Sequence, residues 1–139
     1  MTRAVHRSLP GRREAAAAAS LGVVIALGQV PFSLAWLALP ALAALLFLLS
    51  RERRALPAFW LGLLAGAGHF ALALNWIVWP FFVDPWRHGW MAPFALVLLA
   101  FGMGLFWGGA AALAARAARP LLALVCALAG AEMLRAHIL

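Results

Sequence analysis

The sequence has one cysteine, four acidic residues and no lysine among its 139 residues. The single cysteine, Cys126, lies in an apolar run, so the chain offers neither a disulfide framework nor a cysteine-based metal site. Its net charge of +7 depends on arginines that fall in short clusters between apolar runs, a distribution that argues against nucleic acid as a partner. No glycine-rich phosphate loop, nucleophile elbow or metal-binding signature is present.

Apolar side chains dominate the composition instead. Hydrophobic residues make up 67% of the chain, and the mean hydropathy of +0.99 exceeds that of soluble domains. We therefore predict an all-α, polytopic transmembrane helix bundle of about five helices. The predicted spans are residues 15–30, 34–49, 57–79, 91–115 and 120–139.

The lengths of these runs differ. Residues 57–79 carry no charge and would cover roughly 34 Å as a helix, enough for the hydrocarbon core. The first two runs would cover only about 24 Å each, which favours a closely packed hairpin. A chain of this size is small for a complete membrane enzyme or transporter, so a fragment of a larger protein is also expected.

Arginines mark alternate ends of the predicted spans. The clusters are Arg3, Arg7, Arg12 and Arg13 in a leader of residues 1–14, then Arg51, Arg53 and Arg54, and finally Arg116 and Arg119. The positive-inside rule then predicts a cytoplasmic N-terminus and places the tryptophan-rich loop, residues 79–90, outside. A cleaved signal peptide is a less favoured alternative for the N-terminal region, because further apolar spans follow it.

Glycines at helical spacing occur in the third and fourth predicted spans. They are Gly62, Gly66 and Gly68, and Gly102, Gly104, Gly108 and Gly109. Small residues let helix backbones approach closely in lipid, which predicts a tight bundle core. The alternative is that glycine is simply common in membrane helices.

Glu132 and Arg135 are the first candidate site residues. Glu132 lies about 16 Å along a helix that begins at Leu121, hence near the membrane midplane, where an ionisable group points to function by default. Arg135, three residues further on, is at the right spacing to pair with it. The pair lines a polar cavity or orients an anionic headgroup, or it is a self-satisfied ion pair or lies at the outer surface; the residues alone leave these alternatives open.

Asn75, Trp76 and Trp79 are predicted lipid contacts at the outer leaflet. Tryptophan prefers the headgroup layer, and Asn75 can hydrogen-bond an acyl ester, although bonding to a neighbouring helix is commoner. His69 stands alone in an apolar span, so we expect a hydrogen-bonded neutral imidazole instead of a ligand. We predict no catalytic residue, metal ligand or cofactor in this chain.

The order of these features resembles the N-terminal transmembrane portion of the bacterial apolipoprotein N-acyltransferase family. The resemblance rests on the break at Pro31-Phe32, the arginine-rich exit of the second span, Phe59-Trp60-Leu61-Gly62, Gly66-x-Gly68-His69-Phe70, Asn75-Trp76-Ile77 and Ala131-Glu132-Met133-Leu134-Arg135. It implies a multi-pass inner-membrane enzyme that transfers a fatty acyl chain from a phospholipid to the N-terminal diacylglyceryl-cysteine of a lipoprotein. The implied partners are a phospholipid donor, a lipoprotein acceptor and membrane lipids.

The resemblance also implies a periplasmic nitrilase-like domain, in which a Glu–Lys–Cys triad forms a cysteine thioester. Because this chain has no lysine, it cannot assemble that triad, and neither Cys126 nor Glu132 takes a catalytic role. We therefore expect a fragment that lacks the nitrilase-like domain and is inactive alone. The alternatives from other classes are half of a small polytopic transporter and a non-enzymatic membrane scaffold.

Overall fold

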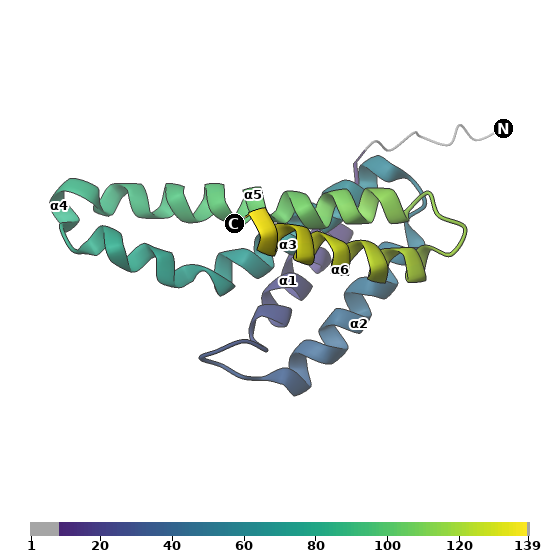
Figure 1. The fold of residues 1–139 in the computed structure, drawn as a ribbon, viewed down its shortest axis with the longest axis horizontal. Helices are drawn as coiled ribbons and strands as arrows, with labels where there is room; N and C mark the ends of the chain where they lie inside the picture. The colour runs from purple at the N-terminus through teal and green to yellow at the C-terminus, as the bar shows by residue number, and fades with distance from the viewer. Residues whose placement is uncertain (1–8, 139) are drawn as a thin grey trace.

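The computed structural model describes residues 9–138, and these residues form helices joined by short turns (Figure 1). The long helices are α1 (Arg12–Ala26), α2 (Ala35–Arg51), α3 (Ala55–Ala73), α5 (Ala92–Ala114) and α6 (Pro120–Ile138). The short ones are the 3₁₀ helices η1 (Asn75–Phe82) and η2 (Gly89–Met91) and the single turn α4 (Pro85–His88). The predicted all-α bundle is confirmed. Of the predicted leader, Arg3 and Arg7 lie outside the described residues, as does residue 139 of the fifth predicted span.

Among residues 9–138, three helical segments are long and apolar enough to cross a membrane. They are Ala55–Ala73, Pro85–Ala114 and Pro120–Ile138, and α2 is apolar but shorter. With successive helices reversing direction through short turns, the chain is a multi-pass membrane protein.

Residues 57–79, expected as one span, are divided at Leu74. α3 ends at Ala73, and the chain continues as η1, in which the Ile77 amide donates to the Leu74 carbonyl three residues back, at 3.0 Å. Pro80 explains the change, because its ring has no N–H to donate and would clash with the carbonyl four residues earlier in an α-helix. A tighter helix therefore replaces the last turns of the predicted span.

α3 is the centre of the bundle and packs between α1 and α5. At the α1 contact, a Cβ built on Gly22 would overlap the carbonyl oxygen of Ala65, so the two backbones touch. At the α5 contact, a Cβ on Gly66 would lie 2.8 Å from the Cα of Gly104. The predicted packing role of glycine is confirmed at Gly66 and Gly104, whereas the close contact at Gly22 was not predicted.

Two of the predicted packing glycines, Gly102 and Gly109, make no close contact with a neighbouring helix among residues 9–138. A Cβ added to Gly102 or to Gly109 would meet no atom within 4 Å, and both glycines line an apolar groove of about 550 Å³ between α5 and α6. Their side of α5 is therefore free of close backbone contacts in the part of the chain that the structure describes.

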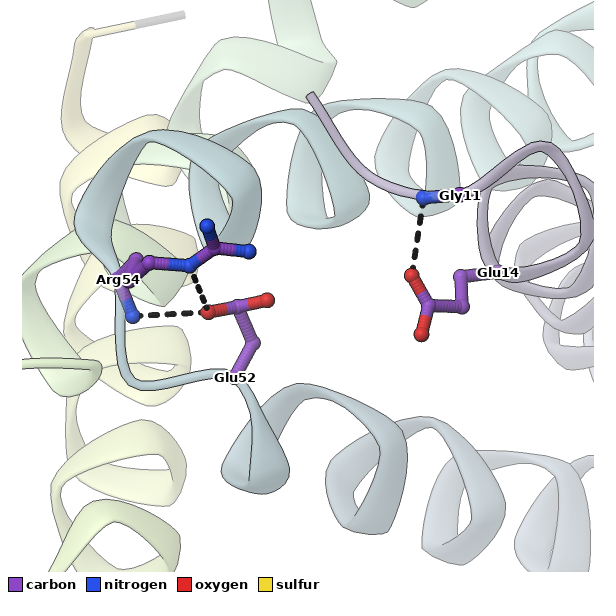
Figure 2. A network of polar contacts seen from close by, with 4 residues as sticks. All are labelled: Gly11, Glu14, Glu52 and Arg54. Carbon is purple, nitrogen blue, oxygen red and sulfur yellow. Dashed lines mark hydrogen bonds and ion pairs between the residues drawn. The ribbon is translucent and has the colours of Figure 1, made fainter. Parts of the chain in front are cut away.

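The arginine clusters meet at one end of the bundle, which we call the arginine end. It holds the start of α1, the α2–α3 turn and the α5–α6 turn (Figure 1). Local carboxylates order the first two of these segments (Figure 2). The Gly11 amide donates to Glu14 Oε2 at 2.9 Å, and Arg54 donates from its amide at 2.9 Å and from Nε at 3.3 Å to Glu52 Oε1.

At the opposite end, residues 75–91 form a hairpin that we call the arm. The arm and the first turns of α5 extend beyond the ends of α1, α2 and α6 (Figure 1). Its tip exposes large apolar side chains, of which Trp86 is 97% exposed. Trp90 holds the tip together by donating from Nε1 to the Arg87 carbonyl at 3.2 Å. Four of the seven tryptophans, Trp76, Trp79, Trp86 and Trp90, therefore lie at the end of the molecule opposite the arginine clusters.

A candidate polar cavity below the arm

A cavity of about 370 Å³ lies where the bundle meets the arm. It draws residues from the turn after α1 and from α3, η1, α5 and α6, so only the folded chain creates it. Its lining residues are Gln29, His69, Phe70, Ala73, Leu74, Trp76, Trp107, Glu132 and Arg135. Polar side chains that are far apart in an otherwise apolar sequence meet here.

Glu132 is the centre of the hydrogen bonding. Trp107 Nε1 donates to its Oε1 at 2.7 Å, which ties α5 to α6. Arg135 donates to its Oε2 from Nε at 2.9 Å and from Nη2 at 2.7 Å, one helical turn along α6. Hydrogen bonds to an ionised group are the stronger ones, and together these fix the carboxylate in place. The predicted pairing of Glu132 with Arg135 is confirmed.

The ion pair is partly accessible, since the exposed fractions are 39% for the Glu132 side chain and 32% for that of Arg135. The Arg135 guanidinium also lies over the Phe70 ring, 5.4 Å from its centroid, a cation–π arrangement that holds the long side chain against α3. The sequence left open whether Glu132 and Arg135 form an ion pair or line a polar cavity. In the structure they do both.

An aromatic cluster forms the inner wall. His69 stacks on Trp107 with ring centroids 5.0 Å apart and planes 24° apart, and the edge of Phe70 contacts both rings. The stacking positions the indole so that its N–H reaches Glu132. His69 is only 6% exposed, and its Nδ1 has no hydrogen-bond partner. Apolar rings surround Nδ1, and the imidazole hydrogen-bonds the Gly22 backbone through its other nitrogen, so in the described part of the chain the expected hydrogen-bonded imidazole has a partner at one ring nitrogen only.

The predicted site residues divide into two groups. Trp76, Glu132 and Arg135 line the cavity together, whereas Asn75 and Trp79 lie on the exposed part of η1 and do not line it. Within residues 9–138 the Asn75 side chain makes no hydrogen bond, so the commoner fate of a bond to a neighbouring helix is not observed.

Sequence reasoning missed two hydrogen-bonding side chains of the cavity, those of Trp107 and Gln29. Trp107 lies inside a span, where tryptophan reads as packing, and its partner is 25 positions away. Gln29 is a polar residue at the end of the first apolar run, and this position was the sequence signal that could have pointed to it. Within residues 9–138 no three His, Cys, Asp or Glu side chains could hold a metal ion together.

The fold and the cavity define the chain as a polytopic α-helical membrane protein with a polar cavity between its helices. Residues 21–139 match the family model described as the apolipoprotein N-acyltransferase N-terminal domain. The chain belongs to the apolipoprotein N-acyltransferase family.

A curated relative supports this assignment. The chain is 43% identical over 129 residues to the apolipoprotein N-acyltransferase of Caulobacter vibrioides, an alignment that covers 85% of this chain and 23% of that protein. The chain thus spans about a quarter of the relative's length. No solved structure matches it.

Proposed function

We propose that this chain is the membrane portion of an apolipoprotein N-acyltransferase, an enzyme that moves a fatty acyl chain from a phospholipid to the N-terminal diacylglyceryl-cysteine of a lipoprotein. The observation that carries the proposal is the family match over residues 21–139, with 43% identity to a protein bearing that name. The acyl donor, the lipoprotein acceptor and the bacterial inner membrane as location all follow from membership of the family.

The charge distribution supports an orientation for this membrane portion. The arginine clusters lie at one end of the bundle, and the arm at the other end carries four tryptophans and a single arginine, Arg87, as expected if the arginine end is cytoplasmic and the arm is outside. The cavity then opens on the outer side, where lipoproteins are modified in this family. Trp76, Glu132 and Arg135 would contact lipid from the cavity, and Asn75 and Trp79 from the arm.

The residues of this chain do not include the family's catalytic triad, so we propose that the bond-making steps take place in other parts of the enzyme. The sequence contains no lysine, and Cys126 lies exposed on α6 without the Glu and Lys partners of the family's triad. The role of this portion is to hold lipid and to position it at the outer surface. We expect the isolated chain to have no acyltransferase activity.

A chimera tests the proposal directly. Replacing the aligned N-terminal region of the Caulobacter relative with this chain should give a membrane enzyme that acylates the α-amine of a diacylglyceryl-cysteine peptide. The matched control replaces the same region with an unrelated helix bundle of equal length, which should abolish acyl transfer. If the chimera inserts into the membrane and is still as inactive as the control, the proposal is overturned.

A further inference from the structure

Arg135 has hydrogen-bonding capacity that its ion pair does not use. A guanidinium carries five N–H donors, and Glu132 accepts two of those of Arg135, which leaves three. Guanidinium groups with free donors recognise phosphate well, because the planar fork matches the spacing of two phosphate oxygens. The cavity thus contains one side chain suited to a phosphate group.

If α3 spans the hydrocarbon core, the cavity lies toward the layer that holds lipid phosphates. α3 has 19 residues and is about 28 Å long, close to the roughly 30 Å of a hydrocarbon core. If Arg54 stands at one surface, then Ala73 and Leu74 at the cavity wall reach the other. Arg135 lies beside Phe70, about 22 Å along α3, and its long side chain can extend toward the surface.

A second and independent feature also indicates a ligand. His69 is 6% exposed, lines the cavity and leaves its Nδ1 without a partner. A buried polar atom without a hydrogen bond is costly. The other ring nitrogen of His69 donates to the Gly22 backbone, so Nδ1 of the neutral imidazole presents a lone pair, which a glycerol hydroxyl would satisfy. The cavity volume of about 370 Å³ falls in the range of small-ligand sites.

We propose that this cavity is a phosphate-binding subsite that holds one phospholipid headgroup, with the free N–H groups of Arg135 donating to the phosphate. Its contribution to acyl transfer rests on the proposed function, because the subsite would orient the donor lipid beneath the catalytic domain. Glu132 sets the position of the guanidinium and also offsets its charge, which keeps the affinity moderate and lets the lipid leave.

Two substitutions should act in opposite directions. Arg135→Gln removes the charged donor and should weaken lipid binding by about tenfold or more, the size of one charge-assisted hydrogen bond. Glu132→Gln can still accept from Trp107 but no longer neutralises Arg135, so binding should tighten severalfold. The matched control is Arg87→Gln, because Arg87 is an exposed arginine at the same end of the molecule and outside the cavity.

The measurement is a titration of the full chain, in detergent micelles, with dioleoylphosphatidylglycerol, followed by native mass spectrometry. Dioleoylglycerol, which has the same acyl chains and no phosphate, is the comparison ligand. Displacement by inorganic phosphate would assign the site to free phosphate. Retention of the lipid, together with weaker binding of dioleoylglycerol, would assign the site to the phospholipid headgroup. Far-UV circular dichroism confirms that each variant is folded.

Equal binding of the two lipids, or equal affinity of folded Arg135→Gln and Arg87→Gln, would overturn the subsite. If the lipid titrations refute the subsite, the result of the chimera experiment is not affected, since that experiment measures acyl transfer by the whole enzyme. Conversely, an inactive chimera does not alter lipid titrations of this chain. The two proposals can therefore fail separately.

Discussion

Replacing Gly22 with alanine would measure how closely α1 approaches α3. The new Cβ would overlap the Ala65 carbonyl oxygen, which belongs to the backbone of a helix packed on both sides and cannot rotate away. Overpacking of this kind costs about 3 kcal/mol at the upper end of its range. Alanine regains about 1 kcal/mol through its higher helix propensity. The expected net loss of stability is therefore about 2 kcal/mol.

Gly109 supplies the matched control for this substitution. It is also a helical glycine, but a Cβ there would meet nothing within 4 Å. Gly109→Ala should therefore keep the propensity gain and raise stability by up to about 1 kcal/mol. The two variants should differ by roughly 3 kcal/mol although the chemical change is identical.

The assay is unfolding of the full chain from mild detergent micelles by added dodecyl sulfate, followed by far-UV circular dichroism. A lower midpoint for Gly22→Ala and an unchanged or higher one for Gly109→Ala would support the close contact. If both variants unfold at the same midpoint, the α1 and α3 backbones do not touch, and the packing around the cavity would have to be revised.

Three further predictions concern the site and the orientation. Trp107→Phe keeps the aromatic stack on His69 but loses the hydrogen bond to Glu132, so the same unfolding assay should show a loss of about 1–3 kcal/mol; no change would mean that the bond is not made. His88→Cys in a Cys126→Ala background should react with an impermeant maleimide from outside intact spheroplasts, whereas labelling only after lysis would reverse the proposed orientation. The isolated chain should form no acyl thioester when incubated with phospholipid, and recovery of thioester-linked acyl chain on Cys126 would contradict its assignment as a non-catalytic portion.

Helix number and character could be read from the sequence because they depend on local properties. Apolar runs bounded by arginines and prolines predict helices wherever the tertiary contacts lie, and each of the long helices α1, α2, α3, α5 and α6 overlaps one of the predicted apolar runs. Pro80 was visible too, but its effect on the helix type was not foreseen. A proline signals that a regular α-helix stops, without saying whether a 3₁₀ helix replaces it.

The pairing of Glu132 with Arg135 was also predictable, since three residues along a helix bring two side chains onto one face. The other partner of the carboxylate was not, because Trp107 is on a different helix and helix spacing carries no information about it. The same limit applies to glycine. Gly66 and Gly109 occur in equivalent sequence contexts, yet one touches a neighbouring backbone and the other faces a groove.

The sequence by itself determined that this chain makes apolar helices with arginine clusters at alternate ends and a tryptophan-rich segment between the third and fourth, because hydropathy and charge act on each segment separately. Only the tertiary structure decided that Gln29, His69, Trp107 and the Glu132–Arg135 pair enclose one cavity. Which helix faces meet depends on how closely particular backbones can approach, and contacts between distant segments are a property of the packed chain as a whole.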